Sequence, residues 1–321
     1  MMKKALLLFL LFSALKGYGQ QPTQYSLYML NPFQYNPAYA GLNDGIELTG
    51  VYRNQWQGLS QSPTHQNLNI HFPVYRFSSG LGIDVENDRL GLEQNLKATL
   101  SYNYHLPVGS SSIVAIGVGA GIFQKKITGA DIRTPEGFYA DGVIEHNDNL
   151  SLPTTDANAS TPVFEAGVYL KAEAFEIGVS TVNIQEPTIS SDFLSTQLNR
   201  NYFLTATYNF DLLRNLTAHP SILLKTDQTE WQSEISLLFK YDDNIFLGGS
   251  FRGYNSTTVD AAVLILGADL GDKLRLAYAY DFTLSNLNTV SSGSHEVLLT
   301  YVLGTKVGKG KLPKIIFNPR Y

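Results

Sequence analysis

Few residues of this chain have the type and spacing that chemistry requires. Gly117, Gly119 and Gly121 form a glycine string, but a phosphate-binding loop needs wider spacing and a following helix. The string instead indicates a strand face that another segment approaches closely. His65 and His71 also share a strand face, but six residues of strand separate them by about 20 Å, which is too far to bind one metal ion.

The sequence offers no strong candidate for a catalytic site either. No serine stands in a nucleophile elbow, and the six histidines form no recognisable couple with a serine. Asp141, Glu145, Asp148 and Asp156 lie in one predicted loop without EF-hand spacing, so a solvated loop is favoured over a calcium site, which stays open as an alternative. We therefore predict no catalytic residue, no cofactor, no metal and no enzymatic activity.

The composition is that of one large domain. The chain has 321 residues, of which 12% are aromatic and 16% charged, and this is enough for a large all-β domain. It has no cysteine, which excludes disulfides and a lipidated cysteine anchor. The net charge of -5 gives no reason to expect a nucleic acid partner.

The first residues read as a secretory signal. Lys3 and Lys4 precede an apolar stretch over residues 5–15, and the small residues Gly17 and Gly19 suit cleavage before Gln20. We predict a signal peptide over residues 1–19. The apolar stretch is too short to span a bilayer as a helix.

From residue 45 onward the polarity alternates with the period of a strand. In residues 95–106 one face carries Asn95, Lys97 and Thr99, and the other Leu96, Ala98 and Leu100. Fourteen such runs are predicted over residues 45–55, 64–75, 77–86, 94–106, 111–124, 162–171, 174–181, 199–210, 216–226, 231–241, 244–252, 258–270, 273–281 and 294–303. Many approach the length that a tilted strand needs to cross a bilayer. Residues 45–303 are therefore predicted to form an outer-membrane β-barrel of about 14 antiparallel strands.

The connections between the runs give the barrel an orientation. Even-numbered runs end in tight turns, whereas long segments over residues 125–161, 182–198 and 282–293 follow odd-numbered runs. Bacterial outer-membrane barrels have short periplasmic turns and long outer loops. We therefore expect the tight turns and both chain termini in the periplasm.

The two faces of the runs predict a filled lumen. The predicted inward face carries charges of both signs, which favours mutual pairing over a selective pore: Glu47, Arg53, Lys97, Glu165, Glu176, Glu234, Lys240, Lys273, Arg275 and Asp281. The predicted lipid face carries aromatic rings near strand ends, where such rings suit the headgroup boundary: Tyr52, Tyr104, Tyr208, Phe210, Tyr241, Tyr280 and Tyr301.

Segments on either side of the runs could meet a partner. Residues 20–44 are rich in aromatic side chains and contain two Asn-Pro pairs, which forbid a long helix or a ladder strand, so we expect a plug-like segment in the lumen or against a partner. The glycine face at Gly117 is a possible bed for it. Residues 304–321 form a basic periplasmic tail without an acid, with Lys306, Lys309, Lys311, Lys314 and Arg320. This tail suits an acidic partner or lipid phosphates, and a merely solvated end is an equal alternative.

Several distinctive short motifs are spread across the mature chain. The most specific are Gln24-Tyr25, Tyr28-Met29, Asn31-Pro32, Asn36-Pro37-Ala38-Tyr39-Ala40-Gly41 and Tyr52-Arg53-Asn54-Gln55-Trp56. Further motifs are Ser62-Pro63-Thr64, Gly80-Leu81-Gly82, Asn87-Asp88-Arg89-Leu90-Gly91 and Asn318-Pro319-Arg320-Tyr321. Together these motifs resemble the PorP/SprF family of type IX secretion system membrane proteins. As partner-binding or plug candidates we take Tyr25, Tyr28, Asn31, Pro32, Asn36, Pro37, Tyr39, Gly41, Arg53 and Trp56.

The resemblance implies a barrel similar to the long-chain fatty acid transporters that serves protein secretion and, in some bacteria, gliding motility. Its implied partners are periplasmic secretion-system components, the outer-membrane lipid and the carboxyl-terminal domain of a secreted adhesin that is held at the cell surface. The leading hypothesis is therefore a non-enzymatic anchor in the outer membrane.

Two alternatives stay open at this point. The first is an outer-membrane transporter for small hydrophobic molecules, for which Pro73 and Pro220 could mark a break in strand pairing. The second is a plain diffusion pore, which the mixed inward charges and the plug-like segment disfavour.

Overall fold

The computed structural model describes residues 23–109, 111–140, 142–147, 152–191, 193–254 and 258–304. The predicted signal peptide, all but the first residue of the basic tail, and Asp141 and Asp148 lie outside these ranges. Within the ranges, no helix is long and apolar enough to cross a lipid bilayer.

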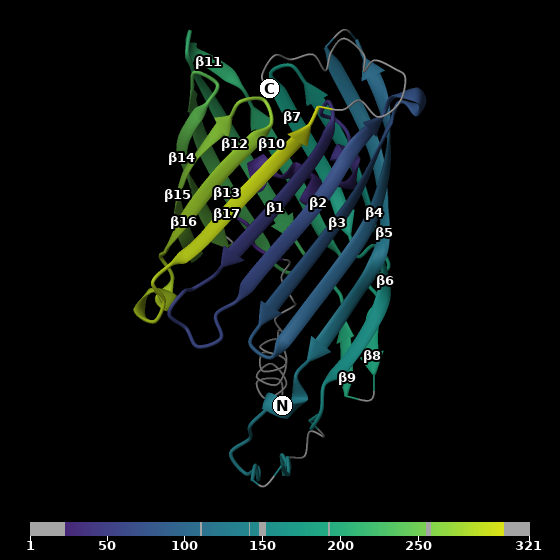
Figure 1. The fold of residues 1–321 in the computed structure, drawn as a ribbon, viewed down its shortest axis with the longest axis vertical. Helices are drawn as coiled ribbons and strands as arrows, with labels where there is room; N and C mark the ends of the chain where they lie inside the picture. Colours follow the sequence, from purple (N-terminus) through teal and green to yellow (C-terminus); the bar gives the residue numbers. More distant parts are fainter. Residues whose placement is uncertain are drawn as a thin grey trace, which may run out of the picture.

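The described residues form a closed antiparallel barrel of fourteen strands (Figure 1). The strands, in chain order, are β1 Ile46–Asn54, β2 Thr64–Val74, β3 Ser79–Leu90, β4 Glu93–Val108, β5 Ser112–Ile127, β6 Ala157–Ala172, β7 Phe175–Val182, β10 Asn201–Tyr208 with β11 Phe210–Leu213, β12 Leu216–Thr226, β13 Trp231–Tyr241, β14 Ile245–Tyr254, β15 Thr258–Leu270, β16 Leu274–Thr283 and β17 Ser294–Leu303. Each strand pairs with its sequence neighbour, and β1 pairs with β17 to close the wall. The predicted fold class is confirmed.

Short elements complete the chain. A separate hairpin joins β8 Thr188–Ser191 to β9 Leu194–Gln197, and six 3-10 turns are present in the described ranges: η1 Tyr28–Leu30, η2 Pro32–Gln34, η3 Pro37–Tyr39, η4 Tyr75–Phe77, η5 Gly129–Asp131 and η6 Asn286–Thr289. The hairpin packs on β6 through Ile189 and Leu198, which cover Val163.

One strand of the wall is interrupted. β10 pairs with β12 as far as Thr207 and Ser221, and β11 resumes the pairing at Phe210 and Ala218. Pro220 lies in this gap, and because proline has no N–H it cannot donate a ladder hydrogen bond. Beside this gap, the N–H of Asn209 donates to the carbonyl of Ala174, at 2.7 Å. By contrast, β2 continues past Pro73 to its last residue.

The long connections gather at one end of the barrel, which is the lower end in Figure 1. They run over residues 55–63, 128–156, 183–200 and 284–293, whereas all six predicted tight turns lie at the other end. The longest connection is shorter than predicted, because β5 and β6 each reach 16 residues and pair along their whole length. Strands β4, β5 and β6 have 16 residues each, so the wall is taller on their side of the barrel.

The alternation places polar side chains inside. Most predicted inward charges are buried or half-buried, including Arg53, Glu234 and Asp281. Lys273 is a correction, because it lies in the tight turn before β16 and is exposed. Among the predicted lipid-facing rings, Tyr280 is half-covered because it packs against the rings of Phe282 and His295, its outward neighbours.

Candidate functional site inside the barrel

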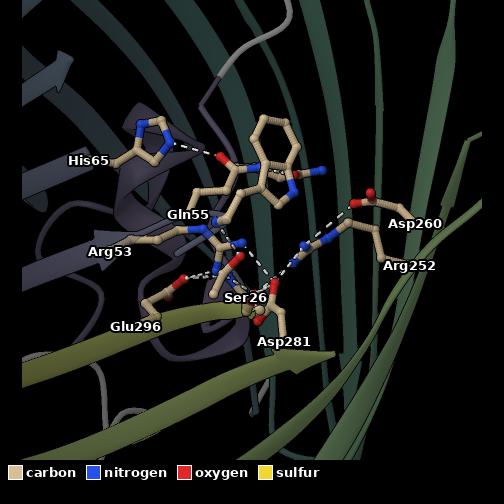
Figure 2. A network of polar contacts seen from close by, with 12 residues as sticks. Ser26, Arg53, Gln55, His65, Arg252, Asp260, Asp281 and Glu296 are labelled. Atoms are coloured by element: carbon tan, nitrogen blue, oxygen red, sulfur yellow. Dashed lines mark hydrogen bonds and ion pairs between the residues drawn. The ribbon is translucent and has the colours of Figure 1, made fainter. Parts of the chain in front are cut away.

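A cluster of buried charges lies on the inward faces of five strands. Arg53 on β1 and Arg252 on β14 are both 1% exposed, and both guanidinium groups contact the carboxylate of Asp281 on β16, at 2.7 and 2.9 Å. Arg53 also contacts Glu296 on β17 at 3.0 Å, and Arg252 contacts Glu234 on β13 at 2.7 Å. The wall strands therefore meet at one ionic network (Figure 2).

Ser26, from the segment before the first strand, occupies the centre of this network (Figure 2). Its hydroxyl donates to Asp281 at 2.8 Å and accepts from Arg53 at 2.9 Å and from Arg252 at 2.6 Å. The backbone N–H groups of Ser26 and Leu27 donate to the two oxygens of Glu296, at 2.7 and 2.9 Å. Buried charges are tolerated when their remaining hydrogen-bonding capacity is satisfied, and Ser26 provides part of that capacity.

The first Asn-Pro pair fastens the segment to β2. Pro32 begins η2, where its missing N–H costs nothing because the first turn leaves that group unbonded. The side chain of Asn31 donates to Asn67 at 3.2 Å and accepts from Asn69 at 2.9 Å. Asn67 in turn donates to Asp84 on β3 at 2.7 Å, so the contact extends to a second strand.

The second Asn-Pro pair fastens the segment to β6 and β7. The carboxamide oxygen of Asn36 accepts from the N–H of Ala38 at 2.9 Å and so caps η3, which begins with Pro37. The amide of Asn36 donates to the carbonyls of Val168 and Val179, at 3.0 and 3.2 Å. One side chain therefore both shapes the turn and attaches it to the wall.

Glycines of the wall make room for the segment. A Cβ added at Gly117 would lie 2.5 Å from the Cα of Ala38, and one added at Gly80 would lie 1.9 Å from the carbonyl oxygen of Ala40. Gly119 and Gly121 face other wall residues instead. Only Gly117 of the predicted glycine face therefore lies under the segment.

The segment leaves the lumen at a left-handed turn. Gly41 has a φ of +65°, and its N–H donates to Nδ1 of His71 at 3.2 Å. A Cβ there would also lie 2.6 Å from the carbonyl oxygen of Phe72, so glycine is required on both counts. Just before it, the ring of Tyr39 packs edge-on against Tyr169 and against His71.

The side of the segment that faces β10, β12 and β13 is bound by apolar contact and through the hydroxyl of Tyr28. Tyr28 and Tyr35 pack with Phe203 and Leu223, and the Tyr28 hydroxyl accepts from Ser236 at 2.9 Å. The hydroxyl groups of Tyr25 and Tyr35 have no hydrogen-bond partner among the described residues and border a narrow space. Burial raises the pKa of Tyr25 well above its usual value, and the carboxylates of nearby Glu86 and Asp88 raise it further. Buried polar groups of this kind are normally satisfied by ordered water.

The structure brings together nine of the ten predicted partner-binding or plug residues, and the five predicted tail residues lie outside the described residues. Trp56 is the exception, because it lies in the connection between β1 and β2 with a φ of +53° and is half-buried. The two histidines do not meet: His71 lies 3.7 Å from Glu47, and His65 lies 2.9 Å from Asp88. In the described part of the chain, no three potential ligands are placed to hold a metal ion.

Three central residues were predicted neither as site residues nor as inward charges. Arg252 and Glu296 lie in predicted strands, and continuing the alternation of those strands would have placed both inside. Ser26 offered no signal, because an isolated serine in an aromatic segment has no distinctive spacing. Chemically, the network can hold the segment against the wall, because Ser26 bonds at once to the carboxylate of Asp281 and to both guanidinium groups.

Comparisons with known proteins agree with this architecture. A family model described as type IX secretion system membrane protein PorP/SprF matches residues 17–301. No curated protein matches the sequence.

Two solved transporters share the fold. The toluene transporter TbuX of Ralstonia pickettii is 12% identical, with a TM-score of 0.50, and the match covers 90% of this chain and 98% of that chain. The toluene transporter TodX of P. putida is 10% identical, with a TM-score of 0.50, and the match covers 87% of this chain and 95% of that chain. At such identities the likeness concerns the fold alone.

Proposed function

We propose, from the premise that this chain belongs to the PorP/SprF family of type IX secretion system membrane proteins, that it is a non-enzymatic outer-membrane component that holds a secreted surface protein. The observation that carries the proposal is the set of contacts inside the barrel. The chain's own residues 24–43 bond to wall strands all round the lumen, among them β2, β6, β7, β16 and β17. A barrel occupied in this way acts through its two ends.

The end with the long connections is the proposed binding surface for the secreted protein. Phe138 and Val143 in the connection after β5, and Phe193 in the β8–β9 hairpin, are large apolar side chains exposed to solvent. Exposed apolar side chains on loops beyond the membrane favour a protein partner. The partner class we propose is the carboxyl-terminal domain of a secreted adhesin.

The end with the tight turns is the proposed contact with periplasmic components. Strand β17 ends there, and the basic tail of residues 304–321 follows it in the sequence, with lysines and Arg320 that suit an acidic partner or lipid phosphates. Deleting residues 305–321 should reduce recovery of periplasmic partners, and gliding where the host glides, while the barrel still folds. Unchanged recovery of those partners would remove the tail from the proposal.

The surface-protein contact is tested by purifying the tagged barrel in mild detergent and identifying bound proteins. We expect one large secreted protein, and we expect its recovery to fall several-fold in the variant F138S/V143S/F193S. L213S is the matched control, because Leu213 is 63% exposed beside a tight turn at the opposite end. Equal recovery from both variants would contradict binding through these loops.

A second candidate function is transport of small hydrophobic molecules. The interruption of pairing between β10, β11 and β12 favours it, because a gap in the ladder is where a ligand could pass sideways through the wall. Barrel-dependent uptake of toluene into vesicles, with no protein recovered in the purification, would support transport over anchoring.

A further inference from the structure

On the outward faces of β2 to β6, the side chains change from apolar to polar over two successive rows in the direction of the long connections. Neighbouring strands in register place the following residues side by side. One row is Leu68, Val85, Ala98, Ile122 and Pro162; the next is Gln66, Asn87, Leu96, Gln124 and Ser160; the last is Thr64, Arg89, Gln94, Lys126 and Asn158. The strands concerned lie side by side in Figure 1.

The polar rows form a connected surface of amide groups. Asn87 donates to Gln66 at 3.3 Å, and Gln94 donates to Asn87 at 2.7 Å, so three strands are linked on the outside. Gln124 and Asn158 are exposed and take part in none of the hydrogen bonds between described side chains. Their amides present donors and acceptors outward.

A shallow groove crosses these rows. It has a volume of about 190 Å³ and is lined by Gln94, Leu96, Gln124, Lys126, Asp156 and Asn158. Lys126 contacts Asp156 at 2.6 Å, with both side chains about two-fifths exposed, so water screens the pair and leaves the ammonium further donors. Arg89 is exposed on the same row, two strands away from Lys126.

The opposite side of the barrel differs. Toward the same end, the exposed large side chains on β13, β14, β15 and β16 are Trp231, Phe251, Val259 and Phe282. Amides and cations therefore distinguish the β2–β6 surface from the β13–β16 surface, where aromatic and apolar side chains prevail.

We propose that this surface binds the phosphorylated saccharide headgroup of an outer-leaflet glycolipid. A lipid seated here would lay its acyl chains on the apolar row and its headgroup on the two polar rows. Arg89 and Lys126 lie about 10 Å apart, at the spacing of three adjacent strands, and can contact headgroup phosphates from both sides of Gln94. The amides of Gln94, Gln124 and Asn158 suit sugar hydroxyls, which an ordinary phospholipid supplies in smaller number.

This inference rests on the orientation in which the long connections face outward, but it does not depend on the secretion role. It is therefore tested on the purified full chain. Native mass spectrometry would compare binding of a rough lipopolysaccharide, which carries phosphorylated sugars, with binding of phosphatidylglycerol, which carries charge without a saccharide. Variant R89Q/K126Q should bind the lipopolysaccharide about tenfold more weakly, and Q124A/N158A should also lose affinity.

The control is R214Q, which removes an exposed arginine near a tight turn at the opposite end. It should leave binding unchanged. Equal affinity of the unaltered barrel for both lipids, or unchanged lipopolysaccharide binding by R89Q/K126Q with its barrel intact, would overturn the proposal. Loss of binding in R214Q as well would do the same, because the effect would then follow total charge.

Discussion

Arg53 and Arg252 are tolerated in the interior because the carboxylates of Asp281, Glu234 and Glu296 and the hydroxyl of Ser26 bind their guanidinium groups. Removing one member of such a network leaves its partners charged, buried and unpaired, which costs more than the pair contributes. The two arginines share Asp281, and they also share the hydroxyl of Ser26. The stability of the wall and the attachment of the segment are therefore coupled at these residues.

Substitution of Arg252 tests this coupling. R252M should lower the free energy of unfolding by about 3 to 5 kcal/mol, because Glu234 would remain buried without its cation and Asp281 would keep only Arg53. Urea titration of the barrel in detergent micelles measures the change. R214M is the control, since Arg214 is exposed, and its effect should stay within about 0.5 kcal/mol. Equal stability of R252M and the unaltered chain would contradict the assigned role.

How far the sequence predicts such a site depends on the periodicity around each residue. The inward positions of Arg53, Glu234 and Asp281 follow from alternation, because a strand places every second side chain on one face. The distances between them do not follow, since the strands that carry them are far apart in sequence. Alternation also does not show which strands meet at Ser26, because that depends on how the barrel closes.

At the scale of elements, fourteen strands could be predicted because their alternation is regular and their lengths are similar. The β8–β9 hairpin could not, because its strands have four residues each and give no countable period. The extra height of β5 and β6 was missed for another reason. Their ends toward the long connections carry polar residues on both faces, as loops do, and cross-strand pairing decides their structure.

The segment before β1 makes an element-scale prediction. G80A should displace residues 38–41, because the new Cβ would meet the carbonyl oxygen of Ala40 at 1.9 Å. We expect residues 24–43 to become sensitive to added protease, with a loss of about 1 to 3 kcal/mol in stability from overpacking. The matched control is G50A on β1, where the nearest atom is Cδ1 of Leu68, at 3.9 Å. If the segment resists protease as well in G80A as in G50A, the wall accommodates the new Cβ and the prediction is wrong.

The whole molecule combines a barrel shape shared with transporters and an interior fastened to its own chain. Hydrogen bonds hold the segment toward β1, β2, β16 and β17, and apolar contacts, with hydrogen bonds of the Tyr28 hydroxyl, hold it toward β10, β12 and β13. The interrupted pairing also involves β10 and β12. The more apolar side of the segment therefore faces the interrupted part of the wall.

Removal of the segment tests whether it closes the lumen. A variant that lacks residues 24–43 should conduct ions in planar bilayers, whereas the unaltered chain should not. The exposed lumen would be richer in carboxylates than in cations near the network, where Asp260, Asp281, Glu234 and Glu296 face Arg53 and Arg252. The open pore should accordingly prefer cations, which the reversal potential in a potassium chloride gradient measures. G50A serves as the closed control, and an anion preference or an equally conductive unaltered chain would contradict closure by the segment.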